Sequence, residues 1–414
     1  MNPRAAGRPI TIAIDCRVLS RGSPGLNRYV KELVGHLPGM LQQGERLVAL
    51  LSEAGALPDL DPRVEAVVAP NAKAAAHRLA SAKVDLYHLP WLSGKAGHYD
   101  GLPRFQRGVL TVPDLILYDY ERHFGAKHRK PARWHRFRRS LRRAVRAASG
   151  VLVYSDYIAD QVVARFGIDP ARVHTIPLAA SGCLSVPPRD VRTQVRERLG
   201  LPQRYLLSVG SDFPHKNLPL LLEGFSRFGA LSGRGNVALA LVGQSVWSET
   251  RARLRQRIVE LGAEQRVFLI DHVPDDDLAA LMAGATAFVF ASREECFGLP
   301  PLEALSSGTP VVCGRAGPLP EVLGDVPEWF PVDDPDALAE AIDALVSDPA
   351  RAEAQRRVAA PLLARYSWRL TARQTFDAYR RVLDEPAAEL VPRLRLKASS
   401  LWQFASRPRS RSSG

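Results

Sequence analysis

Short apolar runs recur along the 414 residues and alternate with segments whose apolar positions have helical spacing. In the first half, these runs predict strands at 9–15, 46–51, 64–69, 84–89, 108–112, 150–154 and 173–176. The same alternation continues in the second half, with strands predicted at 204–211, 237–242, 266–270, 287–291 and 310–313. Strands that alternate with helices are typical of doubly wound α/β domains with sites at the carboxyl ends of the strands.

Length and local composition predict two domains and their boundaries. The first domain is expected at 1–180, followed by a linker at 181–203 that contains two prolines and several arginines. The second domain is expected at 204–365, with helices at 335–346 and 350–365. A further helix is predicted at 366–384. The tail, 385–414, is rich in Pro, Arg and Ser and is expected to be poorly ordered.

The segment 286–325 carries the most informative local pattern. A strand of buried type is followed by a charged turn, by Phe297-Gly298-Leu299-Pro300-Pro301, and by a helix. The free N–H groups and positive dipole end of that helix suit a phosphate. Glu295 on the loop and Glu303 in the first helical turn flank this expected phosphate site. Because carboxylates accept hydrogen bonds from vicinal hydroxyls, the pattern indicates a nucleotide-sugar pocket. The alternative is a pair of solvated charges, one of them favoured by the helix dipole.

The net charge of +13 favours anionic partners. Residues 127–148 contain ten Lys and Arg and no acid, and Trp134, Phe137, Leu141 and Ala148 recur at helical spacing. This basic amphipathic helix has three readings: a core-packed helix with a basic outer face, a contact with an anionic membrane surface, or a nucleic-acid site. The basic tail offers a second membrane contact. Nucleic-acid binding is not expected, because no RNP-type or helix-turn-helix signature is present.

Other features exclude several protein classes. No apolar run approaches the 18 residues of a membrane span, and the N-terminus has no signal-peptide core. The four cysteines, Cys16, Cys183, Cys296 and Cys313, lack metal-type spacing. We therefore expect a cytoplasmic protein without a metal site or a disulfide framework.

The run from Glu295 to Val312, ECFGLPPLEALSSGTPVV, resembles the donor-site signature of retaining GT-B glycosyltransferases of family 4. It has that family's two glutamates with seven residues between them. Leu319-Pro320-Glu321-Val322 and Asp333-Asp334-Pro335 continue the pattern. The resemblance implies a GT-B fold: two Rossmann-like, doubly wound domains facing a central cleft, with a terminal helix crossing back to the first domain. It also implies a nucleotide-diphosphate sugar as donor substrate and no separate cofactor.

The resemblance assigns roles to residues of the second domain. Lys216 fits as a phosphate partner, and His215 stands where arginine is common. Glu295 is expected to bind hydroxyls of the donor sugar and Glu303 the ribose. Val273 is a candidate for the nucleobase by position. Donor binding is also expected at Ser211, Phe297, Gly298 and Leu299.

The first domain departs from the family pattern at two places. The family's Gly-x-Gly is here Gly25-Leu26-Asn27, predicted as a loop in which Asn27 is able to adopt a left-handed conformation. The family's His-Asp is here Pro113-Asp114, and proline keeps a carbonyl but has no side-chain donor. We hypothesise a donor that lacks or does not need a 6-hydroxyl, such as a 6-deoxyhexose or a pentose. Asp114 either caps the following turn or contacts substrate.

These features favour a glycosyltransferase that moves a sugar to an acceptor hydroxyl with retention, in cell-surface or lipid-linked glycan assembly on the cytoplasmic membrane face. The candidate catalytic residues are Glu295, Lys216, Asp114 and Pro113. The alternative is a catalytically impaired relative that binds nucleotide sugar or a partner enzyme. Asn27, Pro113 and His215 favour that alternative, whereas the glutamate pair and Lys216 argue against it.

Overall fold

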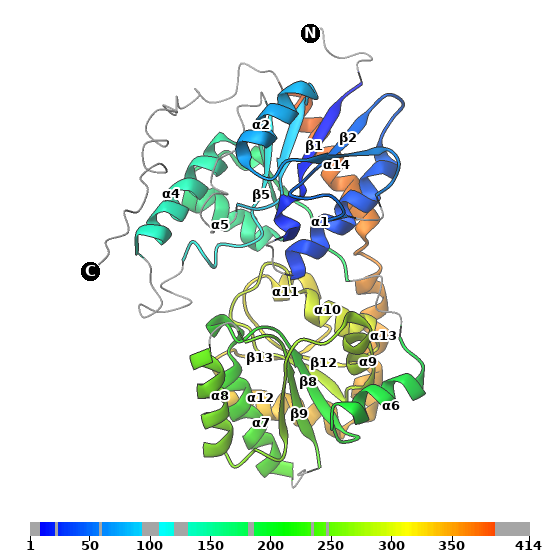
Figure 1. Cartoon of the computed structure of the whole chain (residues 1–414). Helices are drawn as coiled ribbons and strands as arrows, with labels where there is room; N and C mark the ends of the chain where they lie inside the picture. Colours follow the sequence, from blue (N-terminus) through cyan, green and yellow to red (C-terminus); the bar gives the residue numbers. More distant parts are fainter. Residues whose placement is uncertain are drawn as a thin grey trace, which may run out of the picture.

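The structure is a computed structural model that describes residues 9–20, 24–57, 60–92, 107–119, 131–180, 186–232, 236–245 and 248–385. The described chain forms two domains, each built on a parallel β-sheet with helices on both faces (Figure 1). The predicted tail beyond Glu385 and residues 127–130 of the predicted basic segment lie outside the described residues.

The N-terminal sheet has the strand order β3-β2-β1-β4-β5-β6-β7. Its strands are β1 (Thr11–Asp15), β2 (Arg46–Leu51), β3 (Val64–Val68), β4 (Leu86–Leu89), β5 (Gly108–Thr111), β6 (Gly150–Val153) and β7 (Val173–Thr175). Helices α2 (Ala72–Ser81), α4 (Pro131–Ala147) and α5 (Asp156–Phe166) pack on one face, and α1 (Pro24–His36) packs on the other. The central strands are buried on both faces, as a parallel sheet requires.

The C-terminal sheet has the order β10-β9-β8-β11-β12-β13. Its strands are β8 (Tyr205–Val209), β9 (Ala238–Val242), β10 (Val267–Ile270), β11 (Ala287–Phe290), β12 (Val311–Gly314) and β13 (Glu328–Phe330). Helices α7 (Leu218–Ser232), α8 (Ser248–Glu260) and α12 (Pro335–Ser347) share a core with one face. The other face packs against α9 (Asp275–Gly284), α10 (Leu299–Ser306), α11 (Leu319–Leu323) and α13 (Pro349–Leu363). The predicted doubly wound architecture is confirmed.

The last helix, α14 (Trp368–Asp384), returns to the N-terminal domain and completes its core (Figure 1). Ser367 caps it by accepting the Leu370 N–H at 3.1 Å. Trp368, Phe376 and Tyr379 are buried on the face that packs against α1 and β6. The crossing predicted for 366–384 is therefore present.

Three local predictions need correction. The first helix begins at Pro24 rather than at Arg28, because proline at the first helical position has the right φ and no N–H to satisfy. Part of the predicted linker forms α6 (Arg189–Arg198), which packs against α9. The helix predicted to start at Leu302 starts at Leu299. Most other predicted strands are one or two residues shorter in the structure.

The predicted basic helix is α4, and its apolar stripe packs into the domain core. Phe137, Leu141, Val145 and the following Ala148 are buried against the sheet. Its polar face carries exposed arginines, and α4 lies on the outer flank of the N-terminal domain (Figure 1). The exposed face of α4 is therefore positively charged, whereas its buried apolar side chains pack in the domain core.

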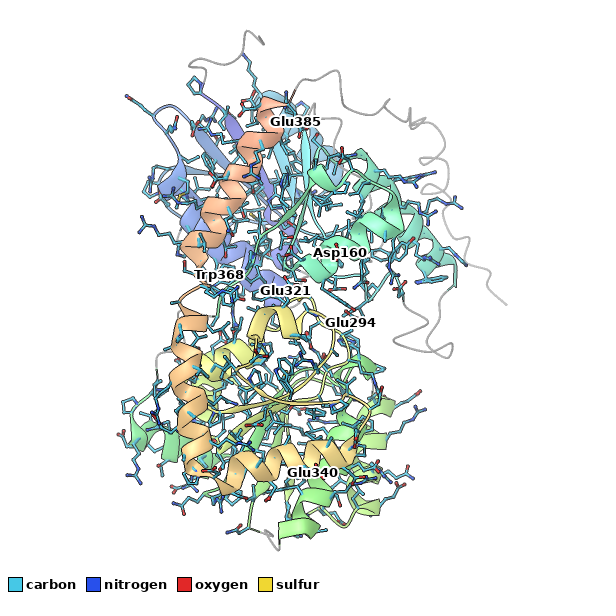
Figure 2. All side chains as sticks on the ribbon, turned by 180° about the vertical axis from the view of Figure 1, so that it is seen from behind. Asp160, Glu294, Glu321, Glu340, Trp368 and Glu385 are labelled. Carbon is cyan, nitrogen blue, oxygen red and sulfur yellow. The ribbon has the colours of Figure 1, made fainter. Side chains whose placement is uncertain are left out.

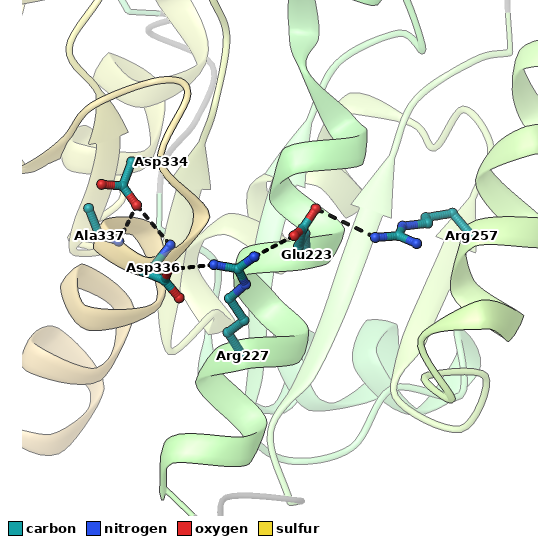
Figure 3. A network of polar contacts seen from close by, with 6 residues as sticks. All are labelled: Glu223, Arg227, Arg257, Asp334, Asp336 and Ala337. Atoms are coloured by element: carbon teal, nitrogen blue, oxygen red, sulfur yellow. Dashed lines mark hydrogen bonds and ion pairs between the residues drawn. The ribbon is translucent and has the colours of Figure 1, made fainter.

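On the outer face of the C-terminal domain, ion pairs link three helices (Figure 3). Glu223 of α7 lies 3.5 Å from Arg257 of α8, and Arg227 of α7 lies 2.5 Å from both Glu223 and Asp336 of α12. Asp334 caps α12 by accepting two backbone N–H groups. These side chains are a third or more exposed, so water screens the ion pairs and the α7–α12 contact depends mainly on its buried packing.

That packing predicts the effect of one added methyl group. A Cβ at Gly224 in α7 would lie 2.5 Å from Leu338 Cδ2 and 3.0 Å from Leu338 Cβ. We expect Gly224→Ala to lower the free energy of unfolding by about 1–3 kcal/mol through overpacking, measured by urea denaturation. Gly35→Ala in α1, where a Cβ meets nothing within 4 Å, is the control and should be neutral or stabilise by up to about 1 kcal/mol. Equal stability of the two variants would contradict this account of the packing.

Candidate active site

A pocket opens at the carboxyl ends of β8, β9 and β11, where the strand order of the C-terminal sheet reverses direction. Ligands of doubly wound sheets bind at such switch points. Gly210 and Gly243 bring the ends of β8 and β9 together, since a Cβ on Gly243 would lie 1.9 Å from the Gly210 carbonyl oxygen. Lys216 and Arg251 line this pocket with positive charge.

Lys216 forms an ion pair with Glu295 inside the pocket region. The Lys216 Nζ lies 2.5 Å from Glu295 Oε1, and the two side chains are 16% and 8% exposed. The backbone holds the two loops together, because the Arg293 N–H donates to the His215 carbonyl at 2.7 Å. The ammonium also lies 5.4 Å from the centroid of the Phe290 ring. The structure thus brings two of the predicted catalytic residues into direct contact.

The loop before α10 presents fewer backbone donors than the sequence pattern predicts. Pro300 and Pro301 occupy the first turn and have no N–H, so the donors left at this end are the Gly298 and Leu299 amides. Gly298 has φ +107°, and a Cβ there would lie 2.5 Å from Leu319 Cδ2, so a side chain would be strained at this position. A phosphate at this end would be bound mainly by these two amides.

Glu303 is buried in α10 and has its partner in the other domain. Arg28 Nη1 of α1 donates to Glu303 Oε1, and the two side chains are 22% and 5% exposed. Arg28 also lies 4.0 Å from Asp275 at the start of α9. Sequence reasoning missed Arg28; the available signal was its place next to the glycine-bearing segment of the first domain.

Asp114 faces this charge cluster from the N-terminal domain. The pKa of its carboxyl is raised to about 6, mainly by burial. The hydrogen bond from the Ile116 N–H lowers this pKa, the charge of Glu295 raises it, and that of Lys216 lowers it. Its Oδ1 also accepts the Ile116 N–H at 2.9 Å, so the predicted capping of the turn is present. Pro113, next to it, is buried.

Several predicted donor-binding residues differ in their surroundings. Gly25 and Asn27 lie in the first turn of α1 rather than in the predicted loop, so Asn27 does not use the left-handed conformation that was open to it there. Gly25 is exposed, and a Cβ there would meet nothing within 4 Å. His215 and Val273 are buried. The His215 ring stacks on Phe213, with centroids 5.6 Å apart.

Two further predicted donor-binding residues lie near the pocket. Ser211 is partly exposed beside Gly210. Phe297 is buried, and its ring packs edge-on against Tyr366 with centroids 5.6 Å apart, so the side chain serves packing. The acids at the start of α9 lie in its first turn, where the dipole favours them, but Pro274 is the N-cap residue and no side-chain cap bond forms.

Further contacts cross between the domains beside the site. The Asp156 and Tyr157 N–H groups at the start of α5 donate to the two oxygens of Glu321 at 2.8 and 3.0 Å. The Tyr157 hydroxyl lies 3.2 Å from Glu294 Oε2. Figure 2 shows Glu321 and Glu294 on the side of the C-terminal domain that faces the N-terminal domain. Carboxylates of one domain thus meet donors of the other.

Within the described residues, no group of three or more His, Cys, Asp or Glu side chains is arranged to hold a metal ion. No helix of the described chain is both long and apolar enough to cross a membrane.

Comparison with known proteins shows the family. The profile of the family Glycosyl transferases group 1 matches residues 191–360. The chain is 30% identical over 280 residues to O-antigen chain mannosyltransferase B of Escherichia coli, a match covering 67% of this chain and 71% of that protein. It is 31% identical over 291 residues to MMP alpha-(1->4)-mannosyltransferase of Mycolicibacterium hassiacum, covering 68% and 66% of the two chains.

The fold is also that of solved structures. HepE of Anabaena, crystallised with UDP and glucose, aligns with a TM-score of 0.69 and 19% identity, over 90% of this chain and 100% of HepE. That likeness concerns the arrangement of two Rossmann-like domains. With the match to the Escherichia coli enzyme, it shows that this chain belongs to the family Glycosyl transferases group 1 and is a glycosyltransferase of GT-B fold.

Proposed function

We propose that the protein is a retaining glycosyltransferase of family 4 type that transfers a hexose from a nucleoside-diphosphate sugar to an acceptor hydroxyl. The observation that carries the proposal is the buried Lys216–Glu295 pair, whose Glu295 is followed along the chain by the Gly298 and Leu299 amides at the start of α10. It joins a cation and backbone donors, suited to a diphosphate, with a carboxylate suited to sugar hydroxyls.

In this proposal the leaving diphosphate is stabilised by Lys216, by the Gly298 and Leu299 amides and by the dipole of α10. Arg251 lines the same pocket and adds a second positive charge, although its Nη2 also lies 2.7 Å from the exposed Asp271. No metal ion is needed to neutralise the leaving group.

Donor binding requires Lys216 and Glu295 to exchange partners. The diphosphate competes with Glu295 for the ammonium, and the carboxylate then accepts hydrogen bonds from hydroxyls of the sugar. Glu303 accepts those of the ribose. A phosphate oxygen of the donor assists deprotonation of the acceptor, and closure of the domains excludes water from the reacting atoms.

Mannose is the donor sugar we propose, because both relatives compared here are named as mannosyltransferases. The acceptor is a glycan or a lipid-linked saccharide of cell-surface polysaccharide assembly, since the Escherichia coli relative is named for the O-antigen chain. Buried Pro113 supports a second candidate class, a 6-deoxyhexose or pentose donor, because it offers no side-chain donor to a 6-hydroxyl.

The test of the function is turnover with a panel of nucleotide sugars. We expect release of nucleoside diphosphate, above buffer hydrolysis, with one hexose donor, measured by a coupled assay. Lys216→Ala and Glu295→Gln should each lower kcat/KM by about 100-fold or more, as loss of charge stabilisation in a buried site does. Arg227→Ala on the outer face of α7 is the control. Nucleotide-sugar binding without turnover would favour the catalytically impaired alternative, and preference for a 6-deoxy donor would favour the second donor class.

The raised pKa of Asp114 predicts a pH-dependent effect on stability. Its folded pKa of about 6 lies above the ordinary 3.8, so ionising it disfavours the folded state as pH rises through about 4 to 6. Asp114→Asn removes this penalty and should be more stable than wild type at pH 7 by up to about 2 kcal/mol. The difference should vanish below pH 4 in thermal unfolding experiments. A pH-independent difference would show that burial of the charge is not its cause.

We also propose that the exposed face of α4 contacts anionic lipid, which would place the enzyme peripherally on the cytoplasmic membrane face. Arg136, Arg139, Arg143 and Arg146 recur three or four residues apart, so they share one face, and all are exposed. Each basic residue near an anionic surface contributes about 1 kcal/mol.

Sedimentation with phosphatidylglycerol-containing vesicles tests this contact. Arg139→Gln with Arg143→Gln should weaken vesicle binding about tenfold or more, and high salt should abolish wild-type binding. Arg356→Gln with Arg357→Gln on exposed α13 removes the same charge elsewhere and is the control. An equal loss in both double variants would point to net charge rather than to α4.

A further inference from the structure

A guanidinium of the N-terminal domain reaches the carboxylate buried in α10 of the other domain. Arg28 donates to Glu303, whose side chain is 5% exposed, and lies 4.0 Å from Asp275, whose side chain is 73% exposed. An exposed ion pair contributes little, whereas a buried carboxylate depends strongly on its cation. The contact with Glu303 is therefore the significant one.

Arg28 stands on a rigid part of the fold. Its neighbour Tyr29 is buried, and the Tyr29 hydroxyl lies 3.2 Å from Thr111 Oγ1 at the end of β5. Thr111 Oγ1 lies 2.7 Å from His88 Nε2, and His88 Nδ1 lies 2.6 Å from the Tyr379 hydroxyl of α14. This buried chain ties α1 to the sheet and to the crossing helix, so the guanidinium is presented from a fixed base.

We infer that Arg28 is a positioning residue for ribose recognition that acts through Glu303. The inference rests on the proposed function, in which Glu303 accepts the ribose hydroxyls. A carboxylate has two oxygens and about four acceptor positions, so Glu303 is able to bind Arg28 and a ribose together. Arg28 holds the buried carboxylate in one orientation, so that its remaining acceptor positions are presented in a fixed geometry.

This arrangement links nucleotide recognition to the position of the domains. Glu303 belongs to the C-terminal domain and Arg28 to the N-terminal domain, so the ribose site is complete only when the two domains are together. A nucleotide whose ribose engages Glu303 therefore favours the arrangement in which Arg28 is in place.

The test uses nucleoside diphosphates that differ only in the ribose. Titration calorimetry with UDP and GDP identifies the tighter ligand of the wild-type protein, which is then compared with its 2′-deoxy and 3′-deoxy analogues. We expect wild type to prefer the ribonucleotide over at least one analogue by about 10- to 100-fold. Arg28→Gln should reduce this preference to about threefold or less, mainly by weakening the ribonucleotide. Arg28→Lys keeps the charge without the planar fork and should be intermediate.

Three controls separate positioning from a general structural effect. Glu303→Gln should lose the same preference, and the Arg28→Gln/Glu303→Gln double variant should lose no more than either single variant. Arg46, at the start of β2, is an arginine of the N-terminal domain that pairs with Glu65. The Arg46→Gln variant should keep the full preference for the ribonucleotide. Thermal unfolding of each variant shows whether it is folded at the titration temperature.

The outcomes distinguish this inference from the function on which it rests. Ribonucleotide binding with an unchanged preference in Arg28→Gln overturns the role of Arg28 and leaves the proposed function intact. Equal binding of ribo- and deoxyribonucleotides by the wild-type protein also overturns the role of Arg28, because Glu303 then does not hold the ribose. A wild-type protein that binds neither UDP nor GDP overturns the nucleotide site and this inference together.

Discussion

Two carboxylates are buried in the wall of the site, and the arrangement around them follows from the need to neutralise each one. Glu295 and Glu303 have side chains that are 8% and 5% exposed. An ionised carboxylate at such depth is unfavourable unless a cation and hydrogen bonds compensate it. Lys216 neutralises the first from the same domain, and Arg28 neutralises the second from the other domain. The carboxylates that are suited to sugar and ribose hydroxyls thus also determine where the cations of the site must lie.

Charge complementarity also operates where the domains meet, although Glu321 is exposed there whereas Glu294 is buried. Glu321 is held by the N-terminal amides of α5, and Glu294 by the Tyr157 hydroxyl. A helix N-terminus favours a negative charge, so Glu321 does not need a cation partner. In each of these contacts, and in that of Arg28 with Glu303, the C-terminal domain supplies the carboxylate and the N-terminal domain the donor. The chain crosses from the C-terminal domain into α14, and α14 packs in the core of the N-terminal domain.

Sequence periodicity predicted the strands of both sheets except β13, because buried parallel strands such as Ala287–Phe290 are continuous apolar runs between polar loops, whereas β13 has three residues and is only partly buried. Periodicity did not by itself single out Lys216, Glu295 and Asp114, which came from the resemblance to the family and which the structure brings close enough to interact. It failed at Pro24, because Gly and Asn in the next positions resemble a loop although a helix tolerates them in its first turn. It also missed Arg28 and Glu321, because a contact between domains depends on how the two domains are docked and leaves no periodic signal in either.

The departures from the family pattern leave both buried ion pairs of the site in place. The His215 side chain is a buried ring stacked on Phe213, while its carbonyl fixes the loop of Glu295, so position 215 serves packing and loop geometry. The permanent charge absent there is offset by Arg251, which lines the same pocket from α8. Asn27 lies in a regular helical turn beside Arg28, and Pro113 keeps its carbonyl next to Asp114. A site that had lost its function would have no reason to keep two buried carboxylates whose neutralisation requires cations from both domains.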